Sequence, residues 1–65
     1  MERYLQFGVL LKEETDKAYL FVFDEDQEER WVPKSQCVWE PETEDLTEGT
    51  VEVPEWWANK EGLPT

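Results

Sequence analysis

Short apolar runs separated by polar segments follow one another along this chain, and they predict a protein built mainly of β-strands. The clearest run is AYLFVF at residues 18–23, where six apolar side chains, rich in aromatic and β-branched types, are bounded by charge on both sides. Alternation along this strand places Tyr19, Phe21 and Phe23 on one face and the three remaining side chains on the other. Both faces are therefore expected to be covered by other parts of the protein.

The remaining apolar segments predict four further strands, one helical turn and one short helix. The first strand begins at Tyr4 and carries Gly8 as the expected site of a bend or bulge. The segment PKSQ at 33–36 is expected to form one tight helical turn, because proline fixes φ. The segment PEWWANKEG at 54–62 resembles a short helix, with proline first, glutamate in the first turn, lysine in the last and glycine just beyond. The other expected strands are RWVP at 30–33, CVWE at 37–40 and TVEVP at 50–54.

This order of elements predicts one mainly β domain over residues 1–65. We expect five short antiparallel strands to close into an SH3-like or OB-like barrel, with the C-terminal helix capping it through Trp56 or Trp57. Closure removes exposed strand edges, which favours a barrel for aromatic strands this short. An open antiparallel sheet with the helix across one face is the alternative.

Size limits how such a chain can fold. At 65 residues, a protein buries only about 60% of its unfolded surface, so each large side chain matters. Nine aromatic residues, four of them tryptophan, supply the apolar area, and a folded rather than a disordered chain is expected. The sequence shows neither the pattern of a secretory signal nor an apolar run of about 20 residues, so we expect a cytoplasmic protein.

Charge changes this picture most. Seventeen acidic residues stand against six basic ones, giving a net charge of −11. Such a protein repels nucleic acid and anionic membranes, and it is steered toward basic surfaces at rates that fall with salt. The expected partner is therefore a basic nucleic-acid-binding protein or effector complex, bound by a chain that is expected to be monomeric.

Catalytic chemistry is not expected from these residues. Cys37 and Ser35 have no histidine to activate them, because the chain contains none. Paired carboxylates are abundant, but a chain of this size has little apolar material left to build a cleft that buries a substrate. We expect no enzyme activity and no cofactor.

Metal binding is not expected either. One cysteine and no histidine exclude the usual zinc sites. Asp24, Asp26 and Glu28 alternate as in an EF-hand loop. However, Glu29 stands where that loop needs glycine, and Ser35 stands where it needs glutamate.

Two acidic segments form the expected working surface. In an extended chain, side chains two residues apart project on one side about 6.7 Å apart, close to two steps of the phosphates along one DNA strand at ~3.4 Å each. A net charge of −11 opposes folding and exceeds the magnitude of about 2 to 8 that solubility needs. We therefore expect mimicry of DNA, with a merely solvated surface as the alternative for any one cluster. The candidate contact residues are Asp24, Glu25, Asp26, Glu28, Glu29, Glu40, Glu42, Glu44, Asp45 and Glu48.

Two segments, RWVPKSQ and VEVPEWWANKEGL, resemble small domains of phages and mobile elements that share W-x-P-K-S-Q and V-P-x-W motifs followed by a K-x-G-L tail. The matching positions are residues 31–36 and 53–56, with Lys60, Gly62 and Leu63. In size and acidity the chain is also similar to phage-encoded DNA mimics, including some anti-CRISPR proteins. This resemblance implies an inhibitor that blocks the DNA-binding surface of a host protein such as a CRISPR effector.

Two other functions use the tryptophans. In the first, an exposed patch of Trp39, Trp56 and Trp57 grips a partner protein as an adaptor would, and the acidic residues serve solubility. In the second, Trp31 and Trp39 stack on the bases of a single-stranded nucleic acid. The second is disfavoured because so acidic a chain lacks the positive groove that such binding needs.

Overall fold

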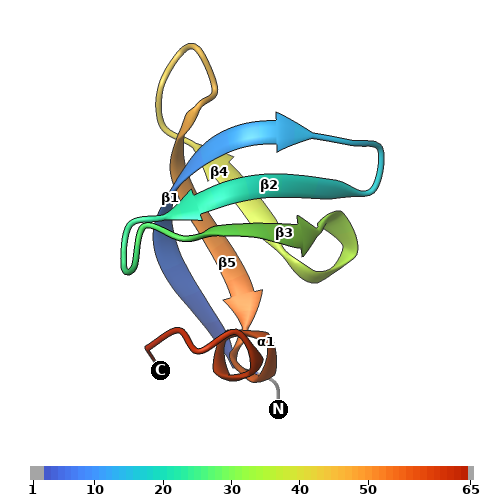
Figure 1. Cartoon of the computed structure of the whole chain (residues 1–65). Coiled ribbons are helices and arrows are strands. Elements are labelled where there is room, and N and C mark those ends of the chain that lie inside the picture. The colour runs from blue at the N-terminus through green and yellow to red at the C-terminus, as the bar shows by residue number, and fades with distance from the viewer. Residues whose placement is uncertain (1–2, 65) are drawn as a thin grey trace.

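A computed structural model describes residues 3–64, which form a five-stranded sheet, one 3₁₀ turn and one α-helix (Figure 1). The turn η1 (Lys34–Gln36) joins the third strand to the fourth, and α1 (Glu55–Lys60) directly follows the fifth. The predicted mainly β class, with five strands and a short C-terminal helix, is confirmed. The strands are β1 (Tyr4–Glu14), β2 (Ala18–Phe23), β3 (Glu29–Pro33), β4 (Val38–Pro41) and β5 (Glu48–Pro54).

All neighbouring strands are antiparallel, in the order β3-β2-β1-β5-β4. The long strand β1 serves two partners, because its first part pairs with β5 and its second part pairs with β2. Figure 1 shows β1 curving between these two partners. The edge strands β3 and β4 do not pair with each other within residues 3–64, so the sheet is open, as in the alternative architecture, and no closed barrel forms. Each edge strand ends in a proline, Pro33 or Pro41, which has no N–H to donate across a closing seam.

The core lies between one face of the sheet and the C-terminal segment. Trp57, only 4% exposed, packs on Phe23 with ring centroids 6.0 Å apart, whereas its neighbour Trp56 is 50% exposed. The helix therefore covers the sheet through Trp57. The sheet residues of this core are Phe7, Val9, Phe21, Phe23, Val32, Val51 and Val53, joined by Ala58 and Leu63.

Of the bend or bulge expected at Gly8, the bulge does not form, because the ladder is regular there. The register between β1 and β2 shifts between Leu11 and Glu13 instead. Gly8 pairs regularly with Thr50, and its missing side chain makes room for Asp24, whose Oδ2 would lie 2.6 Å from a Cβ at Gly8. No helix of the described residues is long and apolar enough to cross a membrane.

Candidate acidic binding surface

The β4–β5 hairpin gathers carboxylates on one face. Glu40 pairs across the ladder with Thr50, and the backbone N–H of Glu42 extends the ladder by donating to the carbonyl of Glu48 at 2.8 Å. Side chains directly opposite in an antiparallel pair share a face. Glu40, Glu42, Glu48 and Glu52 therefore project from the side opposite to the buried Val51 and Val53.

Asp24 extends this group across the sheet from the β2–β3 turn. Its backbone N–H donates to the carbonyl of Gly8 at 3.0 Å, and Gly8 pairs with Thr50, the partner of Glu40. Two segments far apart in the sequence thus meet on one side of the molecule. We call Asp24, Glu40, Glu42, Glu48 and Glu52 the acidic face.

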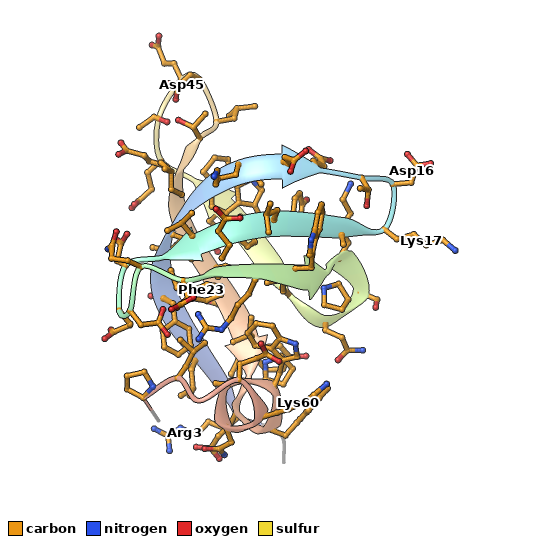
Figure 2. All side chains as sticks on the ribbon, viewed as in Figure 1. Arg3, Asp16, Lys17, Phe23, Asp45 and Lys60 are labelled. Atoms are coloured by element: carbon orange, nitrogen blue, oxygen red, sulfur yellow. The ribbon has the colours of Figure 1, made fainter. Side chains whose placement is uncertain are left out.

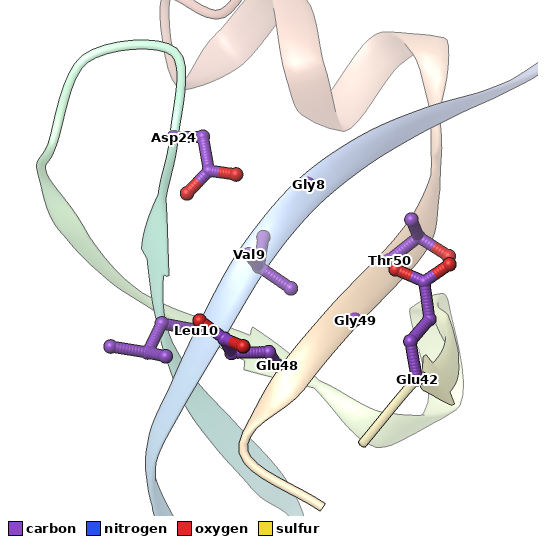
Figure 3. Close-up of a pocket in the computed structure, with 8 residues that line it drawn as sticks. All are labelled: Gly8, Val9, Leu10, Asp24, Glu42, Glu48, Gly49 and Thr50. Atoms are coloured by element: carbon purple, nitrogen blue, oxygen red, sulfur yellow. The ribbon is translucent and has the colours of Figure 1, made fainter.

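Two glycines allow the acidic face to form. A Cβ at Gly49, which is buried, would lie 2.8 Å from Cα of Pro41 and closer still to the carbonyl oxygen of Glu40, so only glycine lets β4 pair here. Around Gly8 and Gly49 lies a surface pocket of about 260 Å³. Figure 3 shows Asp24 and Glu42 on opposite sides of this pocket. Its lining is Gly8, Val9, Leu10, Asp24, Glu42, Glu48, Gly49 and Thr50.

No basic side chain neutralises the acidic face within residues 3–64, because every ion pair there uses other carboxylates. The sequence contains no lysine or arginine between Lys34 and Lys60. Figure 2 shows Arg3 and Lys60 at the α1 end and Asp45 at the opposite end. The pairs are Arg3–Glu55, Lys12–Glu29, Arg30–Asp26, Arg30–Glu61 and Lys34–Glu14.

The predicted residues of the β2–β3 turn are divided. Arg30 donates to Asp26 through Nη1 at 3.0 Å and Nη2 at 2.6 Å, and this holds the pKa of Asp26 below its usual value. Lys12 donates to Glu29 at 2.8 Å. Glu25 and Glu28 are exposed in the turn. The structure thus brings Asp24 to the acidic face, while the charges of Asp26 and Glu29 are compensated.

The loop at 42–47 connects β4 to β5 at the top of the view in Figure 1, and it carries the remaining predicted carboxylates. Oδ1 of Asp45 accepts hydrogen bonds from the hydroxyls of Thr43 at 2.5 Å and Thr47 at 2.9 Å. These bonds lower the pKa of Asp45 and tie the loop together. Glu44 and Asp45 are exposed there, next in sequence to the acidic face rather than on it.

The tryptophans do not form the exposed patch of Trp39, Trp56 and Trp57. Trp39 lies against Phe21, with ring centroids 4.9 Å apart, and Trp57 is buried, so only Trp56 of the three is exposed. Trp31 is half exposed on β3 and does not share a surface with the core-packed Trp39.

The thiol of Cys37 packs against the core, and burial raises its pKa, which keeps it protonated at neutral pH. In the described part of the chain no three metal-ligating side chains converge to hold an ion.

Glu52 belongs to the acidic face and was not among the predicted contact residues. Its signal was the alternation in TVEVP, where Val51 and Val53 point to the core and the glutamate between them must point away. The sequence indicated the pocket only weakly, through Gly8 and Gly49. These two glycines lie close together only because β1 pairs with β5.

Comparisons of the chain with models of protein families, with curated protein sequences and with solved structures found no match. The resemblance to phage and mobile-element domains stays a prediction.

Proposed function

We propose that this protein is a non-enzymatic inhibitor that acts as a DNA mimic and occupies the basic DNA-binding surface of another protein. The observation that most supports this is the acidic face, where five carboxylates from two distant segments project on one side without a basic partner in the described residues. The proposed setting is the cytoplasm of a host cell, and the proposed target class includes CRISPR effectors. This target class follows from the resemblance to phage-encoded mimics.

The fixed spacing of its carboxylates supports a binding role for the acidic face. Side chains two apart on a strand are about 6.7 Å apart, and those directly opposite, such as Glu42 and Glu48, have Cβ atoms about 5 Å apart. The backbone ladder sets both spacings, so a partner need not order the backbone segments that carry the carboxylates when it binds. Such preorganisation reduces the entropic cost of association.

The same arrangement destabilises the fold through repulsion between neighbouring carboxylates, and solubility alone does not require carboxylates so close together. Two unit charges about 5 Å apart in water repel by ~0.8 kcal/mol, and like charges directly opposite in a ladder destabilise it. Lysine and arginine side chains of a partner would remove this repulsion on binding. Binding energy is therefore available from charges that the free protein leaves uncompensated.

The test combines capture, salt and competition by DNA. The protein, immobilised, is incubated with lysate of a host bacterium, and the bound material is challenged with rising NaCl or with excess short duplex DNA. We expect a DNA-binding protein that is released by both, because mimic and DNA would compete for one basic surface. The variant E42Q/E48Q, which loses two charges of the acidic face, should retain less of it.

The matched control is E14Q/D16N, which removes two exposed carboxylates at the β1–β2 turn, outside the acidic face. It changes the net charge by the same amount and should bind as the unmodified protein does. Retention of the partner in the presence of excess DNA, or equal losses in the two variants, would contradict the proposal.

A further inference from the structure

An apolar strip lies beside the acidic face, on the side of the sheet that faces away from the core. It consists of Leu10, Leu20, Val22 and Trp31, in which Leu10 pairs with Val22 across β1 and β2, and Leu20 pairs with Trp31 across β2 and β3. Leu20 is buried but lies outside the core cluster, and the other three are not among the side chains that pack against that cluster. The apolar strip thus lies outside the core cluster, and the ion pair between Lys12 of β1 and Glu29 of β3 spans β2 beside Val22.

Exposure within the apolar strip is uneven. Leu20 is only 6% exposed although it lies outside the core cluster, whereas its cross-strand partner Trp31 is 50% exposed and Leu10 is 39% exposed. Cross-strand partners have Cβ atoms about 5 Å apart, close enough for the indole to cover the leucine. Trp31 is therefore placed where its ring can cover Leu20, and half of its surface is exposed to a partner.

The apolar strip continues into the acidic face through Leu10. Leu10 pairs with Glu48 across β1 and β5, and it lines the same pocket as Asp24 and Glu42. An aromatic anchor and apolar neighbours bordered by charge are the usual composition of a protein-binding surface, whose binding energy is concentrated in tryptophan, tyrosine and arginine.

We propose that the apolar strip and the acidic face form one docking surface for a basic protein, and that Trp31 stacks on an arginine side chain of that partner. The proposal rests on the proposed function and names the chemistry of its partner. Charge complementarity selects the occupant, because a second copy of this chain, a nucleic acid and an anionic bilayer are all repelled by a net charge of −11.

Arginine is favoured over lysine for a physical reason. Its guanidinium is planar and weakly hydrated, so it stacks on an indole while neighbouring carboxylates accept its N–H groups. A lysine ammonium is compact and strongly hydrated, and it is attracted mainly by the charge of the acidic face. Trp31 should therefore discriminate between two partners of equal charge.

The experiment measures binding of two fluorescein-labelled peptides, nona-arginine and nona-lysine, to the full chain by fluorescence anisotropy at low ionic strength. Trp31→Leu keeps an apolar cover over Leu20 and removes the aromatic face. We expect it to weaken nona-arginine binding about fivefold and nona-lysine binding less than twofold, from the usual strength of guanidinium stacking on an indole. The matched control is Trp56→Leu, at an equally exposed tryptophan on α1, which should leave both affinities unchanged.

The variant E42Q/E48Q separates this inference from the proposed function. It should weaken the binding of both peptides and make the binding of both less dependent on salt. If it does so while Trp31→Leu changes both peptides equally or neither, the role of Trp31 is overturned and the proposed function is not. If neither peptide binds, or if E42Q/E48Q binds both as tightly as the unmodified protein, the docking surface itself is overturned. Circular dichroism and thermal unfolding of each variant confirm that the fold is kept.

Discussion

Arg30 connects three parts of the chain through a single side chain. Its guanidinium binds Asp26 in the β2–β3 turn, donates to the carbonyl of Glu61 at 3.2 Å and lies 5.3 Å from the ring centroid of Phe23. The side chain is only 11% exposed. Hydrogen bonds of a charged group at such a site stabilise more than surface pairs do. We expect Arg30→Met, which keeps the apolar stem, to lower the free energy of unfolding by about 2 kcal/mol in urea titrations.

Arg3 is the matched control for Arg30. It also pairs with a carboxylate, that of Glu55 at 3.3 Å, but its side chain is 68% exposed. An ion pair in that setting contributes little, so Arg3→Met should change the free energy of unfolding by no more than ~0.5 kcal/mol. Equal effects of the two substitutions would show that the connections made by Arg30 do not stabilise the fold.

Asp45 gives a prediction about pH. Hydroxyls of Thr43 and Thr47 donate to its carboxylate and lower its pKa below the ordinary 3.8. A pKa that is lower in the folded than in the unfolded chain stabilises the fold fully above the unfolded value, and this contribution is lost as the pH falls through the folded value. Thr43→Val should therefore raise the pKa of Asp45 toward 3.8 in an NMR titration of its side-chain carboxyl carbon.

The control for that titration is Thr50→Val, because the hydroxyl of Thr50 bonds to Gln6 and not to Asp45. It should leave the pKa of Asp45 where it is. An unchanged pKa in Thr43→Val would mean that the loop hydrogen bonds are not maintained in solution.

The attachment of β4 depends on Gly49. Any side chain there meets backbone atoms of Glu40 and Pro41, which cannot move aside as a flexible side chain does. We expect Gly49→Ala to separate β4 from β5, to lower the free energy of unfolding by about 3 kcal/mol, and to speed amide hydrogen exchange in β4. Because Glu40 and Glu42 depend on this pairing, binding of a basic partner should fall as well.

Gly62→Ala tests whether the loss comes from the clash rather than from glycine replacement in general. Gly62 has a φ of 78° but nothing within 4 Å of a Cβ. Alanine there pays only for the left-handed backbone, about 1 kcal/mol. If the two substitutions cost the same, close packing of β4 on β5 is not what Gly49 provides.

Local patterns predicted the individual elements well and their arrangement less well. The strand at 18–23 matches its prediction to the residue, and the turn after Pro33 and the helix after Pro54 lie where proline indicated. Pairing of β1 with β5 joins residues 38 to 50 positions apart, from Leu10 with Glu48 to Tyr4 with Pro54, and no local pattern encodes it. Whether β3 and β4 meet depends on the curvature of the sheet, which is why the open sheet and the barrel were both compatible with the same strands.

In the candidate site, too, local patterns predicted what lies on one segment but not how separate segments are arranged. Alternation predicts one row of Glu40, Glu42 and Glu44 if their segment is extended. The first two do share a side, but β4 ends at Pro41 and the chain turns at Glu44, so the third does not join them. That Asp24 joins them, while Asp26 two residues later is bound by Arg30, depends on where the β2–β3 turn places each carboxylate. The exposed position of Trp31 and the burial of Trp57 likewise depend on which face each element turns to the core.

Charge is distributed unevenly over the whole molecule, and this sets its response to salt. The protein measures 33 × 24 × 17 Å, so at 0.01 M salt, where the screening length is about 30 Å, all its charges interact. At 0.1 M salt the screening length is about 10 Å, so mainly neighbouring charges interact. Salt weakens the ion pairs and the repulsion together. The pairs are mostly exposed and contribute little, whereas repulsion among eleven excess charges is not compensated.

We therefore expect the melting temperature to rise with NaCl between ~0.01 and ~0.5 M. Several neighbouring carboxylate pairs, each repelling by ~0.6 to 0.8 kcal/mol without screening, sum to a few kcal/mol, and one kcal/mol corresponds to roughly 4 to 8 °C in a domain of this size. Thermal unfolding followed by circular dichroism at neutral pH measures the shift. E42Q/E48Q removes one directly opposed pair, so it should melt higher than the unmodified protein at low salt and gain less from added NaCl. A melting temperature that does not depend on salt would mean that the carboxylates are not crowded, and the energetic basis for binding a basic surface would be lost.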